Sequence, residues 1–181
     1  DLGYDVLLRT GSPVTDDDTD AGSSAARTPL ALDQHEEAVA ARAREFAANI
    51  GLPDAVVASV EQAGRWHDEG KRDIRFQAML HGGDMLRAEL ARYPLAKSGM
   101  DPADRVAFQR AQRLSGYPRG MRHEALSARI AAVRVAGRTD LDPELVVRLV
   151  ASHHGRARPL LPAVVDPAPV KVELETGEVF D

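Results

Sequence analysis

The sequence contains no cysteine, which excludes a disulfide scaffold and any metal site built from thiolates. It also lacks an apolar run that approaches the roughly 20 residues needed to cross a bilayer. Its first residues do not combine a basic segment with an apolar one, so we expect no secretion signal. These absences favour a cytoplasmic protein with no membrane segment.

Aromatic residues are also scarce, at 4% of the 181 residues, whereas alanine, valine and leucine are abundant. This composition favours close-packed helices over a β-sandwich. The length suits one domain with a substantial core, and the chain begins at Asp1 rather than Met, as expected of a piece of a longer polypeptide. We predict an all-α fold, a bundle of six or seven helices with a small β element from the chain ends.

The chain is acidic, with a net charge of −5, and only three of its basic residues are lysines. Proteins that coat nucleic acid non-specifically usually carry a basic surface, so this class is disfavoured. An enzyme that holds a few phosphates through a metal and local arginines is compatible with the charge. Guanidinium groups suit such contacts because they can donate two hydrogen bonds to one phosphate.

Changes in composition divide the chain into three parts. Residues 1–30 combine a strand-like start with an acidic linker rich in Ser, Thr, Asp and Gly. Residues 31–162 carry helical periodicity, and residues 163–181 form a C-terminal extension with an expected β-hairpin around Thr176-Gly177. Capping residues, prolines and glycines delimit the expected helices, which cover residues 33–50, 53–70, 72–80, 84–92, 102–114, 122–136 and 143–153.

Four of these helices each place a histidine on their apolar face, and Asp33 is expected to cap the first of them. A single such histidine is most often a hydrogen-bonded core residue, but four that converge predict a common site. His154 directly follows the last one. The four stripes are His35, Val39, Ala43, Phe46 and Ile50; Val56, Val60, Ala63 and His67; His123, Leu126, Ile130 and Val133; and Val146, Leu149, Val150 and His153.

Converging imidazoles would repel one another if protonated, and a divalent cation resolves this because neutral imidazole is a common metal ligand. Asp68, next to His67 at a helix end, can bridge two such ions. Two metals roughly 3.5–4 Å apart are the usual arrangement for phosphoester hydrolysis. The nitrogen-rich ligand set predicts two divalent transition metal ions, Mn, Fe, Co or Ni, with Mg less favoured.

The order His35, His67-Asp68, His123 and His153-His154 resembles the HD metal-dependent phosphohydrolase superfamily. The local sequences WHDEGKRDIRFQAML (66–80), MRHEALSA (121–128) and LVASHHGRARP (149–159) resemble, more narrowly, the HD nuclease domain of the CRISPR-associated helicase-nuclease of type I systems. This resemblance covers about residues 30–162. A His-Asp pair alone is weak evidence for this family, whereas four sequence elements in this order with these local sequences are strong evidence.

The resemblance implies a helical domain that cleaves single-stranded DNA with transition metals. It also implies two partners: a helicase in the same or another chain, and an RNA-guided surveillance complex that recruits it. By position, His35, His67 and Asp68 would hold one metal, and the second would be held or flanked by Asp68, His123, His153 and His154. Lys71 would contact phosphate or a metal-bound water, and Asp68 and Lys71 are the expected catalytic residues.

One feature departs from the family, which usually supplies a last aspartate from a later helix. Asp166 lies between prolines and Asp181 is terminal, and neither belongs to a convincing helix. Either the last ligand lies beyond this chain or one metal site is incomplete. Two alternatives therefore stand beside the nuclease: an HD phosphohydrolase of nucleotides, and a catalytically incomplete HD-fold docking module.

Several residues that flank these motifs have two interpretations each. Arg122 and Arg156 are expected to contact DNA, although ordinary surface arginine is an equal alternative. Glu69 and Glu124 adjoin ligands and could orient an imidazole, or lie at the surface. Trp66 is expected to be a core residue rather than a platform for a base.

Overall fold

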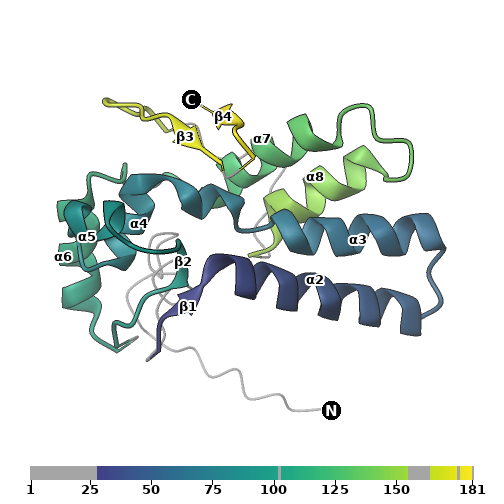
Figure 1. The fold of residues 1–181 in the computed structure, drawn as a ribbon, viewed down its shortest axis with the longest axis horizontal. Coiled ribbons are helices and arrows are strands. Elements are labelled where there is room, and N and C mark those ends of the chain that lie inside the picture. The colour runs from purple at the N-terminus through teal and green to yellow at the C-terminus, as the bar shows by residue number, and fades with distance from the viewer. Residues whose placement is uncertain (1–27, 102, 155–163, 175, 181) are drawn as a thin grey trace, which may run out of the picture.

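The computed structural model describes residues 28–101, 103–154, 164–174 and 176–180. This part of the chain is all-α, as predicted, with seven α-helices, one short 3-10 helix and two small antiparallel sheets of two strands each (Figure 1). The strand-like start and Arg156 lie outside the described residues. The helices are α2 (Leu32–Asn49), α3 (Asp54–Trp66), η1 (Glu69–Arg72), α4 (Ile74–Leu80), α5 (Met85–Glu89), α6 (Arg105–Ser115), α7 (His123–Val135) and α8 (Pro143–Ser152).

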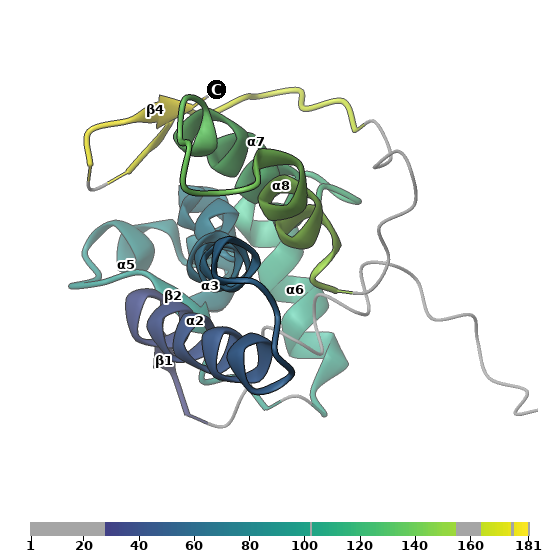
Figure 2. The same cartoon turned by 90° about the vertical axis from the view of Figure 1, so that its right-hand side faces the viewer.

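The strands are short and lie in two places. β1 (Leu30–Ala31) pairs with β2 (Leu95–Lys97), and β3 (Val172–Glu173) pairs with β4 (Val179–Phe180). The second pair is the predicted hairpin around Gly177, and it packs on α7 through Ile130 (Figure 2). The predicted small β element is thus present at the C-terminal end, while the strand-like start at the other end lies outside the described residues.

Helices α2 and α3 form an antiparallel pair along one side of the molecule, with α8 and α7 above them and α4 to α6 at the other end (Figure 1). A Cβ atom on Gly64 would lie 3.0 Å from the Cα atom of Ala40, so glycine allows the two helices to approach closely. This approach brings the start of α2 beside the end of α3, where His35 and His67 lie.

The expected apolar face of α2 is wrong by one position. Its buried residues are Leu32, Glu36, Ala40 and Ala47, whereas Phe46 and Ile50 are 58% and 73% exposed. The expected cap is also wrong, because the helix begins at Leu32 and Asp33 pairs with Arg72 from the first turn. The close contact at Gly64 selects small side chains for this interface, which explains why the larger residues face outward.

The helix expected over residues 53–70 ends earlier, at Trp66. Asp68 precedes the single turn of η1, and Asp73 then caps α4 by accepting a hydrogen bond from the backbone N–H of Arg75 at 2.8 Å. Gly70 lies inside η1 and not at a helix end. The backbone therefore bends at Asp68, which turns this carboxylate away from the direction of α3.

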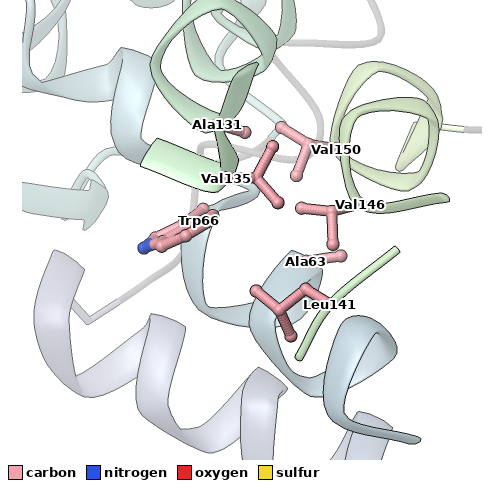
Figure 3. Packing of buried hydrophobic residues seen from close by; sticks show 7 residues of the cluster. All are labelled: Ala63, Trp66, Ala131, Val135, Leu141, Val146 and Val150. Atoms are coloured by element: carbon pink, nitrogen blue, oxygen red, sulfur yellow. The ribbon is translucent and has the colours of Figure 1, made fainter. Parts of the chain in front are cut away.

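The main core lies between α3, α7 and α8. It contains Trp66 from α3, Val135 from α7 and Val146 and Val150 from α8, whose side chains gather between the helices (Figure 3). Trp66 is thus a core residue, as predicted, although one edge of it reaches a cavity described below. Burial of these side chains fixes how the ends of the three helices lie relative to one another, and those ends carry His67, His123 and His153.

A second core around Phe76 joins α4 and α6. The side chain of Gln77 links β2 to this part of the fold. Gln77 donates hydrogen bonds to the carbonyl oxygens of Lys71 and Leu95, and accepts one from the Leu95 N–H at 2.7 Å. β2 is therefore held against the residues that follow Asp68. None of the helices in the described ranges is long and apolar enough to cross a membrane.

Candidate metal centre

All six predicted ligands converge on one point. His35 comes from the first turn of α2, and His67 is the residue that ends α3. His123 is the first residue of α7, and His153 ends α8 with His154 directly after it. The convergence of these helix ends on Asp68 confirms the grouping predicted from the apolar stripes.

The carboxylate of Asp68 lies at the centre, and each of its oxygens faces a different pair of imidazoles. Oδ2 lies 3.5 Å from His35 Nε2 and 3.4 Å from His67 Nε2. Oδ1 lies 3.2 Å from His123 Nε2 and 3.5 Å from His153 Nε2. Asp68 therefore belongs to two ligand groups at once, one with His35 and His67 and the other with the three later histidines.

The imidazoles present their Nε2 atoms to the centre because the backbone holds their other nitrogens. The Nδ1–H of His67 donates to the carbonyl of Gly64 at 2.7 Å, and that of His153 donates to the carbonyl of Val150 at 2.7 Å. In a neutral ring this leaves the Nε2 lone pair directed at Asp68. Each carbonyl lies three residues earlier, so the helix end itself orients the ring.

Burial favours the neutral form of two of these histidines, His67 and His35. It lowers the pKa of His67 to about 4, despite the opposing attraction of Asp68, and it lowers the pKa of His35 as well. For Asp68, burial alone would raise the pKa, but the ammonium of Lys71 and the neighbouring rings of His123 and His153 hold it well below its usual range. The centre thus places a carboxylate beside the uncharged imidazoles of His35 and His67.

This combination fits divalent cations. His123 Nε2 lies 3.3 Å from the Nε2 atoms of both His153 and His154, so three nitrogen ligands meet at one place. Asp68 is 1% exposed, and no described residue donates a well-formed hydrogen bond to its Oδ1. A cation between these atoms would satisfy the carboxylate and the lone pairs together. Nitrogen-rich ligands of this kind favour transition metals over magnesium.

Lys71 lies inside the centre and not at its surface. It is 3% exposed, its Nζ lies 2.9 Å from Asp68 Oδ2, and it donates a hydrogen bond to the carbonyl of Ala96 at 3.2 Å. In this arrangement the ammonium acts on Asp68 and on β2. The predicted contact of Lys71 with phosphate stays a prediction.

Arg122 points to a neighbouring carboxylate. Its guanidinium donates hydrogen bonds to Oε1 of Glu124, one of them from Nε at 3.1 Å, and Glu124 is fully buried. The other carboxylate oxygen of Glu124 lies 3.5 Å from His123 Nδ1. Glu124 is therefore buried between His123 and Arg122 and not at the surface, while its role in orienting the His123 ring stays a prediction. Contact of Arg122 with DNA stays a prediction.

Glu69, the other candidate for that role, turns away from the histidines. It accepts hydrogen bonds from Arg72 at 2.7 Å and from Arg134 at 2.7 Å. Asp68, directly before η1, thus faces the centre, whereas Glu69, the first residue of η1, faces away from it. Of the two aspartates considered for the last ligand, Asp166 pairs with Arg75 at 2.7 Å and does not join the group, and Asp181 lies outside the described residues.

Two residues that position the centre were not recognised from the sequence. The backbone N–H of Gly70 donates to Ser127 Oγ at 2.8 Å, and a Cβ atom at Gly70 would lie 2.1 Å from the carbonyl oxygen of His123. This contact places η1 directly against the start of α7. Ser127 lies one helical turn after His123, and that spacing is the signal that could have identified it.

The chain matches no protein-family model, no curated protein and no solved structure. The resemblance of its motifs to the HD nucleases therefore stays a prediction, and the functional argument rests on the geometry of the centre.

Proposed function

We propose that this chain is a metal-dependent phosphodiester hydrolase that cleaves single-stranded DNA. The observation that supports the proposal is Asp68, a buried carboxylate whose two oxygens each face a separate group of imidazole nitrogens. A shared carboxylate between two ligand groups is the arrangement that two-metal hydrolysis requires.

In this proposal His35, His67 and Asp68 would hold one cation, while Asp68 and the later histidines would hold or flank the other. Divalent transition metals, when bound, would supply an activated water and stabilisation of the charge that develops on the phosphate. The chain itself supplies orientation: the carbonyls of Gly64 and Val150 fix two rings, and Glu124 lies against the Nδ1 of a third. Lys71 keeps Asp68 ionised.

The substrate and partners come from the motif resemblance. We propose single-stranded DNA as the substrate, a helicase in the same or another chain, and recruitment by an RNA-guided surveillance complex in CRISPR interference. The acidic net charge supports an enzyme that receives its strand from a partner over one that coats DNA by itself.

The test is cleavage of circular single-stranded DNA with Mn or Ni, combined with metal analysis of the purified protein. We expect cleavage that depends on the metal and is lost in Asp68→Asn. Asp140→Asn is the matched control, because Asp140 is exposed and pairs only with the exposed Arg138 among the ion pairs of the described residues. Hydrolysis of nucleotides without DNA cleavage would favour the nucleotide phosphohydrolase instead.

A docking module is the second candidate, and the ion pair between Asp166 and Arg75 favours it. That pair gives a structural role to Asp166, the first aspartate that follows the histidine pair in the sequence. If the module is correct, Asp68→Asn leaves partner binding intact and the purified protein holds less than one metal per chain.

A further inference from the structure

A cavity of 390 Å³ lies behind the metal centre, on the opposite side of α2 and η1. His35 and Asp68 face the centre, whereas their neighbours Glu36 and Glu69 line the cavity. Its walls also include the apolar side chains of Trp66 and Leu174. The volume falls in the range of small-molecule sites, which combine apolar walls with a few polar groups.

Glu36 is the polar group of this cavity that lacks a donor. It is 4% exposed, and no described residue donates a hydrogen bond to its Oε1. Its other oxygen lies 3.8 Å from a guanidinium nitrogen of Arg72, beyond hydrogen-bond distance. A buried oxygen with no donor is costly, so this position calls for a ligand that can donate.

The charges around the cavity favour a cation. Its three arginines are each engaged by carboxylates: Arg72 by Asp33 and Glu69, Arg134 by Glu69 and Glu178, and Arg65 by Glu37 and Glu61. Four carboxyl groups line the cavity beside these arginines: Asp33, Glu36, Glu37 and Glu69. Glu36 is the one with no arginine within hydrogen-bond distance, and burial together with the neighbouring Glu69 and Asp68 raises its pKa to about 9. An anionic ligand would add to this repulsion, whereas a cation would complement the carboxyl group.

A metal ion is a poor fit for this cavity. Oxygen-seeking cations such as calcium take six to eight oxygen ligands, and magnesium takes six. Among the cavity residues that the structure describes, only Glu36 offers a buried carboxylate oxygen with no donor. An organic ammonium needs fewer acceptors, and its methylene groups can lie along Trp66 and Leu174.

We propose that this cavity is a binding site for a free aliphatic amine, whose ammonium group donates to Glu36 and whose methylene chain packs on Trp66 and Leu174. The Trp66 ring already attracts a cation, since the Arg134 guanidinium carbon lies 5.7 Å from its centroid. Primary amines are protonated at neutral pH, so the ligand carries the charge that the cavity lacks. The site is separate from the metal centre, and its test does not depend on the hydrolase proposal.

Trp66 is the only tryptophan of the chain, so its fluorescence reports directly on the cavity. The experiment titrates 1,4-diaminobutane into the protein, with 1,4-butanediol as the uncharged ligand of equal length. We expect a saturable change in fluorescence with the diamine and none with the diol. An equal response to both, or no saturable response to the diamine, overturns the proposal.

Two variants and one control locate the site. Glu36→Gln keeps the size of the side chain but removes its charge, and is expected to weaken diamine binding about tenfold or more. Thr176→Lys adds a positive charge at the exposed rim of the cavity and should also weaken diamine binding. It tests whether the cavity binds a cation even if Glu36→Gln fails to fold. Glu45→Gln, on the exposed side of α2, should leave binding unchanged. Unchanged affinity in both cavity variants contradicts the proposal.

Discussion

Substitution of Gly70 by alanine should separate η1 from α7 and weaken the metal centre. The added Cβ atom would lie 2.1 Å from the carbonyl oxygen of His123 and 2.9 Å from the backbone nitrogen of Ser127. Both are backbone atoms, so no side chain can rotate to make room. The two segments must move apart by about 1 Å to restore ordinary contact distances.

The expected loss of stability has two parts. Forcing extra volume into a packed contact costs about 1–3 kcal/mol. The movement also lengthens the hydrogen bond from Gly70 N–H to Ser127 Oγ, now 2.8 Å, and an unsatisfied buried donor costs about 1–3 kcal/mol more. We therefore expect the free energy of unfolding to fall by about 2–6 kcal/mol. Because His123 begins α7, its distance to Asp68 should increase and metal affinity should fall as well.

Urea unfolding followed by circular dichroism measures the first effect, and calorimetric titration with Mn measures the second. Ser127→Ala isolates the hydrogen bond, since it leaves the close approach intact. Gly99→Ala is the control for the loss of a glycine, because its Cβ would meet only the ring of Pro29, at 3.1 Å and beyond. The reasoning is refuted if Gly70→Ala unfolds within about 0.5 kcal/mol of the parent protein, the range of a neutral surface change.

Three further predictions concern charge at the centre. The metal-free protein should lose about 3 kcal/mol of its free energy of unfolding between pH 6.5 and pH 4. In this range His67 takes up a proton in the unfolded chain, whereas in the folded protein its pKa of about 4 keeps it neutral. His67→Asn should flatten this pH dependence, as measured by urea unfolding. Lys71→Met should lower the free energy of unfolding by about 3–5 kcal/mol, because it leaves the buried carboxylate of Asp68 without the Lys71 ammonium. Thermal unfolding with and without Mn should show that bound metal restores part of this loss. Glu124→Gln should weaken metal binding about 10–100-fold in calorimetry while circular dichroism shows the helices unchanged; equal affinity would contradict its orienting role.

The helices themselves could be predicted where local signals agree. Asp142 and Pro143 indicate where α8 begins, and in the structure the Asp142 side chain accepts a hydrogen bond from the backbone N–H of Leu145 at 3.0 Å. The buried face of α2 could not be predicted in the same way. A hydrophobic stripe assumes that large apolar residues face the partner helix, but Gly64 brings α3 so close that alanine is preferred at the interface.

The ligands of the centre could be predicted because each sits at the end of a helix with clear periodicity. The contacts that hold these residues in place could not be predicted. Gly70 and Ser127 are 57 residues apart, and their contact follows from the packing of η1 on α7 and not from any local pattern. The same is true of Gln77, whose amide joins the end of η1 to β2.

The arginines near the centre are internal counter-ions, which changes how mutations in them should be interpreted. The scarcity of lysine suggested that guanidinium groups contact phosphate, yet Arg72, Arg75, Arg122 and Arg134 each form ion pairs with carboxylates of the chain. The side chains of all four are at most 12% exposed. Removal of any of them leaves a carboxylate without its partner and so destabilises the fold. Loss of DNA cleavage in such a variant therefore argues for DNA contact only if its free energy of unfolding equals that of the parent protein.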